Sequence, residues 1–163
     1  MKTLIVFGTK SGTTEKCANK IKEAMASAEA DVFDIRKLKN ADLAAYDVVI
    51  VGTSVYMGRI NGRIRRFLAH NSSALVGKKL HFYVYGLAQG DEGVAQLQKQ
   101  VSDDLFRHAI QAMHLGCEAN YERLYPLYRS LMKKIVTEQK PPTGLHEQEI
   151  IAFAQKVIES AGG

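Results

Sequence analysis

The stretch FGTKSGTTEKCA, residues 7–18, joins an apolar run to a helical pattern through a loop of small and hydroxyl-bearing residues. The apolar run is Leu4–Phe7, and Cys17, Ile21 and Met25 follow the loop at helical spacing. A buried strand is therefore expected to lead through a short polar loop into a helix, whose first N–H groups have no partner within the helix.

The same alternation of strand and helix continues along the chain. Strands are predicted over Thr3–Gly8, Asp31–Ile35, Asp47–Gly52, Lys79–Gly86 and Met113–Asn120. Helices are predicted over Thr13–Ala28, from about Ile60 to Leu68, and over Asp91–Ala112, Tyr125–Thr137 and Glu147–Ser160, with a helical turn at Ala41–Ala45. Apolar strands that alternate with helices are typical of a parallel sheet covered on both faces. The sequence thus predicts an α/β fold with an open doubly wound five-stranded parallel sheet in the order 2-1-3-4-5.

The composition is that of an ordinary soluble protein, with 163 residues of which 46% are hydrophobic and 24% charged. We expect a single domain over residues 1–163, with an extra Tyr/Arg/Lys-rich helical segment at about 121–140. No run approaches the roughly 20 apolar residues of a membrane span, and the start lacks the apolar core of a secretory signal. A cytoplasmic location is therefore expected. Cys17 and Cys117 and the five His residues show no metal-ligand spacing, so we expect no metal site.

The residues after the first strand offer the groups that bind a phosphate, namely Thr9, Lys10, Ser11, Gly12, Thr13 and Thr14. Ligands of open α/β sheets bind at the carboxyl ends of the strands, where backbone N–H groups and the helix dipole favour an anion. The spacing is not a Walker A loop, because Thr13 stands where Lys is required, and GxGxxG is absent. The alternative is that the hydroxyl groups merely cap the helix, for which one or two would suffice.

Two further loops are expected at the same edge of the sheet. They follow the third and fourth strands and contain Ser54, Val55, Tyr56, Met57 and Gly58 in one and Gly86, Leu87, Ala88, Gln89, Gly90 and Asp91 in the other. Their glycines permit close approach of the backbone to a ligand. Tyr56 is suited to stacking on a planar ring, and the alternative is that it packs on the neighbouring helix.

With these three loops the chain resembles the flavodoxin family. The likeness rests on the motif T-x-S-G-x-T at residues 9–14, the three-loop layout and Gly77-Lys78-Lys79 before the fourth strand, and it spans the whole chain. It implies a flavodoxin-like flavoprotein that binds FMN noncovalently, with the phosphate on Thr9–Thr14 and the ring between residues 53–58 and 86–91. No catalytic residue is nominated, because the redox chemistry belongs to the flavin.

Three features differ from ordinary electron-carrier flavodoxins. Those proteins are typically acidic, whereas this chain carries a net charge of +5, and Leu87 and Ala88 stand where they commonly have an aromatic residue. The segments NYERLYPLYRSLMKKIV (120–136) and SVYMGRINGRIRRFL (54–68) resemble the menaquinone-dependent protoporphyrinogen oxidases of this superfamily. This resemblance implies an FMN-dependent oxidoreductase that oxidises protoporphyrinogen IX, or a similar donor, with a quinone.

The positive charge is concentrated in two places. Four arginines (Arg59, Arg63, Arg65 and Arg66) crowd one helix start, and residues 121–140 hold five basic and two acidic side chains. Three interpretations of this segment stay open: a surface helix packed on the domain through Tyr128, Leu131, Met132 and Ile135, an interfacial helix at an anionic membrane, or the wall of a pocket for a flat anionic substrate. We expect Arg59, Arg129, Lys133 and Lys134 to contact the substrate or the membrane. No nucleic-acid-binding motif accompanies the charge.

Two classes of function compete at this point. The first is an enzyme that transfers hydrogen from a tetrapyrrole to a quinone. The second is a basic flavodoxin that carries electrons between proteins, whose charge would select acidic redox partners. A flavin-free regulatory domain remains as an alternative to both.

Overall fold

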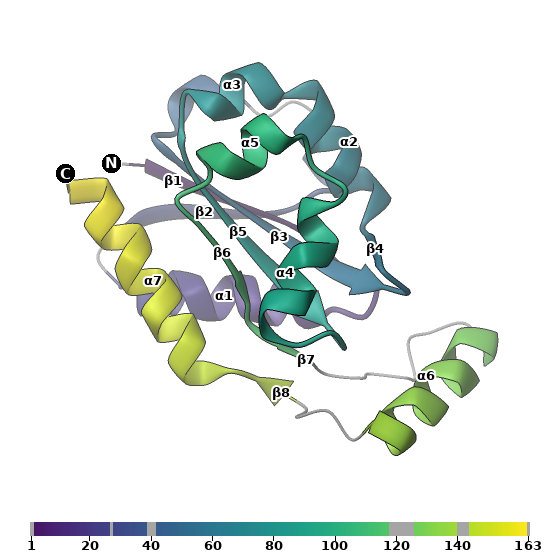
Figure 1. Ribbon diagram of the computed structural model, residues 1–163. Coiled ribbons are helices and arrows are strands. Elements are labelled where there is room, and N and C mark those ends of the chain that lie inside the picture. The colour runs from purple at the N-terminus through teal and green to yellow at the C-terminus, as the bar shows by residue number, and fades with distance from the viewer. Residues whose placement is uncertain (1, 27, 39–41, 118–125, 140–143, 163) are drawn as a thin grey trace.

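The computed structural model describes residues 2–26, 28–38, 42–117, 126–139 and 144–162 (Figure 1). Five parallel strands form the centre of the molecule, in the spatial order β2 (Glu29–Asp34), β1 (Lys2–Gly8), β3 (Val48–Tyr56), β5 (Lys79–Gly86) and β6 (Gln111–His114). A short strand, β4 (Arg59–Ile60), pairs antiparallel with the end of β3. The expected fold class and the order of the five parallel strands are confirmed, and β4 is an addition to them.

Helices cover both faces of this sheet (Figure 1). One face packs against α1 (Thr13–Ala24) and α7 (Glu147–Gly162), and the other against η1 (Leu43–Ala45), α2 (Gly62–His70), α3 (Ser72–Val76), α4 (Gly90–Gln98) and α5 (Asp103–His108). Successive β1 residues alternate between these two cores, with Leu4 on the second face and Ile5 on the first. Because both faces are buried, the strand is a continuous apolar run.

The long helix expected over Asp91–Ala112 is wrong, because α4 ends at Gln98 and a separate helix, α5, begins at Asp103. Ser102 lies between them with an extended backbone (φ −60°, ψ 141°). The break lets the two helices pack on different neighbours, since α4 contacts β5 and β6 while α5 contacts α3. Leu97 and Leu105 thereby both reach the same core.

The strand expected over Met113–Asn120 also differs. Only its first part lies in the main sheet, as β6, whereas β7 (Gly116–Cys117) pairs with β8 (Gly144–Leu145) in a separate antiparallel pair. Gly116 has φ +151°, and a Cβ atom there would lie 2.5 Å from the Gly144 carbonyl oxygen, so a glycine is required for the two strands to meet. The remainder of that expected strand, residues 118–120, lies outside the described residues. β7 and β8 bring the two ends of residues 118–143 together.

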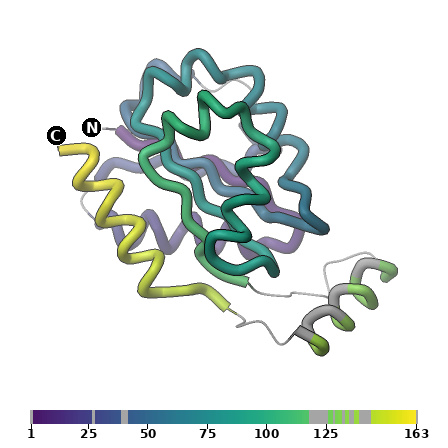
Figure 2. The backbone as a smooth tube through the Cα atoms, viewed as in Figure 1, coloured from purple at the N-terminus to yellow at the C-terminus, as the bar shows by residue number. Residues whose placement is uncertain are grey.

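A helix forms close to the expected range within this segment, as α6 (Pro126–Gln139). Figures 1 and 2 show α6 at the end of the molecule where β7 and β8 lie, apart from the helices that cover the sheet. Leu127 and Leu131 are 80% and 37% exposed. The side chains of Tyr128, Met132 and Ile135 lie outside the described residues. Among the helices of the described ranges, none has the length and apolar character needed to cross a membrane.

Candidate functional site

The loop after β1 is a compact turn whose shape is set by its own hydrogen bonds. Gly12 adopts φ +88°, a left-handed conformation that favours glycine. Its N–H donates to Thr9 Oγ1 at 2.9 Å, and the hydroxyl groups of Ser11 and Thr13 are hydrogen-bonded to each other at 2.9 Å. Ser11, Thr13 and Thr14 are all buried. The expected phosphate-binding residues are thus brought together, with Lys10 exposed beside them.

The start of α1 has the properties of an anion site. The N-cap residue is Gly12, which has no side chain with which to cap the helix. The Thr14 hydroxyl is buried and has no hydrogen-bond partner among the described residues. Buried helix starts and buried hydroxyl groups normally find partners, because an unpaired polar group costs free energy. A phosphate would supply these partners, and the loop therefore fits the phosphate group of FMN.

A hydrogen bond from the central sheet holds the start of α1 in place. The hydroxyl of Tyr83 on β5 donates to the Thr14 carbonyl oxygen at 3.0 Å, and burial raises the pKa of Tyr83 well above its usual value. The hydroxyl therefore stays protonated as a donor. A Cβ atom on Gly52 would lie 1.9 Å from the Tyr83 ring, so the glycine makes room for the ring.

The two cysteines are both buried. Burial raises the pKa of the Cys17 thiol on α1.

Most of residues 53–58, expected to form a loop, belong to the end of strand β3. β3 continues to Tyr56, and the chain turns back into β4 through Met57 and Gly58, which have φ +48° and +72°. Gln100 holds this hairpin from a distant part of the chain. Its Oε1 accepts from the Ile60 N–H at 3.2 Å, and its Nε2 donates to the Gly58 carbonyl oxygen at 2.8 Å. Gln100 is not among the site residues predicted from the sequence, because no local pattern marks a contact between residues so far apart in the chain.

Tyr56 packs against the loop Thr9–Thr14, the expected phosphate loop. The Lys10 Nζ atom lies 5.3 Å from the centroid of the Tyr56 ring, within the range of a cation–π contact. Burial raises the pKa of Tyr56, and the neighbouring Ser11 side chain partly offsets this rise. The ring thus connects the β3–β4 hairpin to residues 9–14. Its stacking on a flavin ring stays a prediction.

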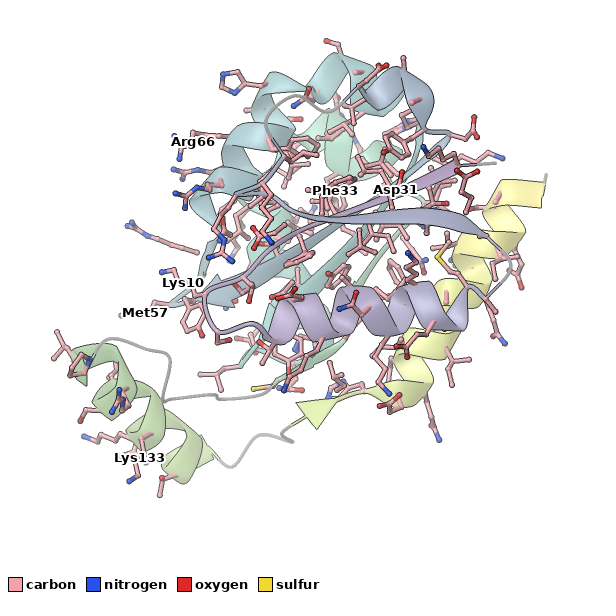
Figure 3. All side chains as sticks on the ribbon, turned by 180° about the vertical axis from the view of Figure 1, so that it is seen from behind. Lys10, Asp31, Phe33, Met57, Arg66 and Lys133 are labelled. Carbon is pink, nitrogen blue, oxygen red and sulfur yellow. The ribbon has the colours of Figure 1, made fainter. Side chains whose placement is uncertain are left out.

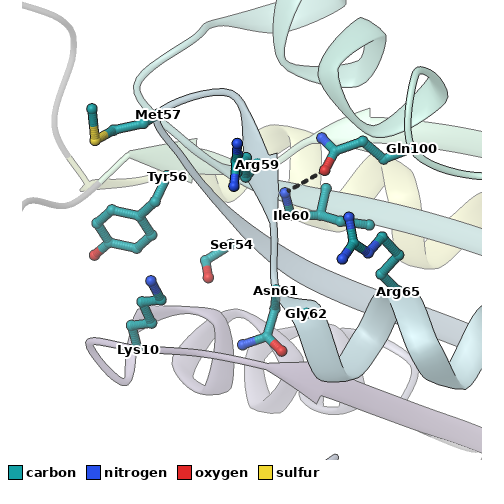
Figure 4. Close-up of a pocket in the computed structure, with 10 residues that line it drawn as sticks. All are labelled: Lys10, Ser54, Tyr56, Met57, Arg59, Ile60, Asn61, Gly62, Arg65 and Gln100. Carbon is teal, nitrogen blue, oxygen red and sulfur yellow. Dashed lines mark hydrogen bonds between the residues drawn. The ribbon is translucent and has the colours of Figure 1, made fainter.

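A cavity of about 560 Å³ lies between the phosphate loop, the hairpin and the start of α2 (Figure 4). The described residues that line it are Lys10, Ser54, Tyr56, Met57, Arg59, Ile60, Asn61, Gly62, Arg65 and Gln100. Its volume is in the range of small-molecule sites. Four of the expected cofactor-binding residues therefore line the cavity, namely Lys10, Ser54, Tyr56 and Met57. One expected substrate contact, Arg59, lines it as well.

The loop after β5 adjoins the hairpin on its other side. Gly86 is paired with Val55, and a Cβ atom on Gly86 would lie 3.0 Å from the Val55 carbonyl oxygen. None of the described residues that line the cavity comes from residues 86–91. His114 Nε2 is 2.9 Å from the Gly86 carbonyl oxygen, and burial lowers the pKa of this histidine. His114 lay outside the sequence prediction, and it supports the beginning of this loop.

The three expected contacts on α6 lie in a different place. Arg129, Lys133 and Lys134 are all exposed, and the Lys134 Nζ atom is 4.0 Å from a carboxylate oxygen of Glu138. Figure 3 shows Lys133 on α6, separate from Lys10 and Met57 at the edge of the sheet.

In the part of the chain that the structure describes, no three His, Cys, Asp or Glu side chains could together hold a metal ion.

Residues 4–145 match the family model of the flavodoxin domain. Protoporphyrinogen IX dehydrogenase (quinone) of Escherichia coli strain K12 is 27% identical over 89 residues, which cover 53% of this chain and 49% of the relative. Flavodoxin 1 of the same strain is 42% identical over 50 residues, which cover 31% of this chain and 28% of the relative. The chain thus spans about half the length, or less, of the curated relatives it matches.

Two solved structures resemble the whole chain. Oxidised flavodoxin 1 from Bacillus cereus has a TM-score of 0.66 at 18% identity, with 98% of both chains covered. A flavodoxin from the domain Archaea has a TM-score of 0.63 at 12% identity, with both chains fully covered. Likeness at these identities shows the fold alone.

Proposed function

The chain belongs to the flavodoxin domain family and its cofactor is FMN, and from this premise we propose that it is an FMN-dependent oxidoreductase that oxidises a protoporphyrinogen-type tetrapyrrole with a quinone. Bound FMN supplies the electron and hydride chemistry. The chain's own residues would bind the cofactor and orient it.

The observation that carries the cofactor site is the buried start of α1, which has a glycine, Gly12, at its N-cap. There the first N–H groups of the helix, the hydroxyls of Thr9–Thr14 and the charge of Lys10 would hold the phosphate. Thr14 Oγ1, which lacks a partner among the described residues, would gain one. Because these donors are held by the loop's own hydrogen bonds, little ordering is needed on binding.

Tyr56 and the loop after β5 would contact the flavin ring. The two segments adjoin through the Val55–Gly86 pair at the carboxyl edge of the sheet, where open α/β sheets bind their ligands. Tyr56 offers a half-buried aromatic surface there, and Gly86, at the start of the loop after β5, is paired with the preceding Val55. These groups would set how much of the ring faces the redox partner.

Helix α6 supports the enzyme over a pure carrier. It presents Arg129, Lys133 and Lys134 together with the exposed Leu127, which is a surface suited to an anionic substrate or to an anionic membrane that holds a quinone. The E. coli relative whose name gives a quinone as acceptor lends a second, independent support. The 42% identity to E. coli flavodoxin 1 over 50 residues favours the second candidate, a basic electron carrier between proteins.

The test is anaerobic turnover of protoporphyrinogen IX with menadione by the FMN-loaded protein. Each step would move a pair of hydrogens from the tetrapyrrole to the quinone, so porphyrin fluorescence should rise as quinol forms. The triple variant R129E/K133E/K134E should keep FMN and lose rate. If the wild type holds FMN but oxidises no donor with several quinones, and its reduced form passes electrons to an acidic acceptor protein, the carrier is the function.

A further inference from the structure

The cavity extends beyond the residues that would hold FMN. Its far wall is formed by Arg59 and Ile60 of β4, by Asn61, Gly62 and Arg65 at the start of α2, and by Gln100. In Figure 4, Lys10 and Tyr56 lie at one end of the cavity, Arg65 and Gln100 lie at the other, and Arg59 lies between them. The far wall therefore carries two guanidinium groups.

The cavity wall carries positive charges, and no carboxylate among the described lining residues balances them. Among the described residues that line the cavity, three are cationic and none is Asp or Glu. Neither arginine forms an ion pair within the described part of the chain, whereas Lys10 lies over the Tyr56 ring. Positive charges gathered around a cavity without a carboxylate attract an anionic ligand, because the low-dielectric walls concentrate the field.

The backbone that carries the two arginines is firmly held. Arg59 is paired directly with Tyr56 across the hairpin, so both side chains project to the same face. Gln100 bonds the hairpin on both sides of Arg59, at Gly58 and Ile60. This arrangement fixes where the Arg59 side chain begins.

The start of α2 is held equally well. The Asn61 side chain caps the helix, accepting from the Arg63 N–H at 3.0 Å, and the Asn61 N–H donates to Thr53 Oγ1 at 3.1 Å. A Cβ atom on Gly8 would lie 2.6 Å from an Ile64 side-chain carbon, so the helix packs closely on the end of β1. Arg65 therefore projects from a rigid element beside the phosphate loop.

We propose that Arg59 and Arg65 form an anion subsite beside the cofactor, which binds a carboxylate or phosphate group of the small molecule that exchanges electrons with FMN. The inference rests on the proposed function, because the same cavity is bounded by Lys10, Ser54 and Tyr56. Guanidinium groups bind carboxylate and phosphate oxygens in a bidentate manner, which gives orientation as well as affinity. The subsite would hold the substrate with its reacting part toward the flavin.

The same helix supplies a matched control. Arg63 and Arg66 line a different surface groove, together with Ile35, Leu38, Phe67 and His70. Figure 3 shows Arg66 apart from Lys10. The variants R59Q/R65Q and R63Q/R66Q thus remove the same charge from neighbouring positions, and only the first changes the cavity.

The experiment titrates FMN-loaded wild type and both variants with three probes at low salt. Mesoporphyrin IX presents carboxylates, inorganic pyrophosphate presents phosphates, and menadione is uncharged. R59Q/R65Q should weaken binding of the anionic probe by about tenfold or more, the scale of a lost charge-assisted hydrogen bond, whereas R63Q/R66Q should change it by less than about threefold. Menadione binding should stay the same. The anion that shows the difference identifies the source as carboxylate or phosphate.

Three outcomes would overturn the subsite: equal losses in both variants, no binding of either anion by the wild type, or a tenfold loss of FMN affinity in R59Q/R65Q alone. The last would make the arginines part of the cofactor site. FMN affinity is measured separately by titrating apoprotein, so failure of wild type to bind FMN would count against the proposed function instead. The probe titration on apoprotein would then still test the arginines. Thermal unfolding confirms that all variants are folded.

Discussion

The phosphate loop and helix α6 both offer anion-binding groups, yet they are built in opposite ways. In the loop Thr9–Thr14 the hydroxyl groups are buried, those of Ser11 and Thr13 are hydrogen-bonded to each other, and the only charge is Lys10 at its rim. On α6 the groups are charges, and Arg129, Lys133 and Lys134 all stand exposed. One region orders polar groups before a ligand arrives, whereas the other keeps its charges in water.

Desolvation explains why this difference matters. Buried donors meet a ligand without competition from water, so each is worth more, and an unpaired one is costly. Exposed charges are screened by salt within about 10 Å and contribute little as single pairs. The loop should therefore determine whether FMN binds, and α6 should modulate encounters with an anionic partner.

The largest effect is expected from the double variant G12E/T13E. It places side chains at a glycine with φ +88° and at a buried threonine, and it brings two negative charges to the phosphate. FMN affinity should fall by at least about 3 kcal/mol, the scale of a buried group left with repulsive neighbours. Fluorescence titration of the apoprotein measures it. Native affinity in this variant would show that the phosphate binds elsewhere.

A single substitution in the same loop, Thr14→Val, separates an effect on FMN binding from an effect on folding. Thr14→Val keeps the shape of the side chain and removes a hydroxyl that has no partner in the described structure. We expect FMN affinity to fall by roughly 1.5 kcal/mol, while the apoprotein unfolds at the same temperature or higher, since an unpaired buried hydroxyl is lost. Thr14→Ser is the control and should retain most of the affinity. A large drop in apoprotein stability would instead mean that the hydroxyl is structural.

Tyr56→Ala tests the contact between the hairpin and the loop. Loss of an aromatic contact should weaken FMN binding by about 1 kcal/mol and shift the visible spectrum of the bound flavin. Tyr56→Phe should keep both. Unchanged affinity and spectrum in the alanine variant would make Tyr56 a packing residue of the hairpin.

The smallest effect on FMN is expected from R129E/K133E/K134E. Because all three side chains are exposed, FMN affinity should change by less than about 0.5 kcal/mol. Sedimentation with anionic liposomes should decrease, and binding by the wild type should weaken as salt rises from low to moderate concentration. A tenfold loss of FMN affinity would place α6 at the cofactor and remove the contrast between the two regions.

The strand order, and the polar loop Thr9–Thr14 between the first strand and the first helix, could be predicted from the sequence because each depends on local pattern. That this loop binds a phosphate stays a prediction. Strands such as Leu4–Phe7 are uniformly apolar since both faces are buried, and a strand followed by small polar residues and a helix has few other interpretations. The break between α4 and α5 could not be predicted in this way. Its apolar positions continue across Ser102, and only packing against α3 shows why the chain turns there.

The sequence by itself determined the fold class, the family resemblance and the identity of the residues at the start of α1. The tertiary structure alone decided that the Thr14 hydroxyl is buried without a partner among the described residues, that Lys10 lies over the Tyr56 ring, and that Gln100 is hydrogen-bonded to the hairpin. It also decided that Arg59 and Arg65 share a cavity that Arg63 and Arg66 do not line. The reason is physical: strand and helix preferences act over a few neighbouring residues, whereas hydrogen-bond partners and cavity walls come from segments that meet only after the sheet is assembled.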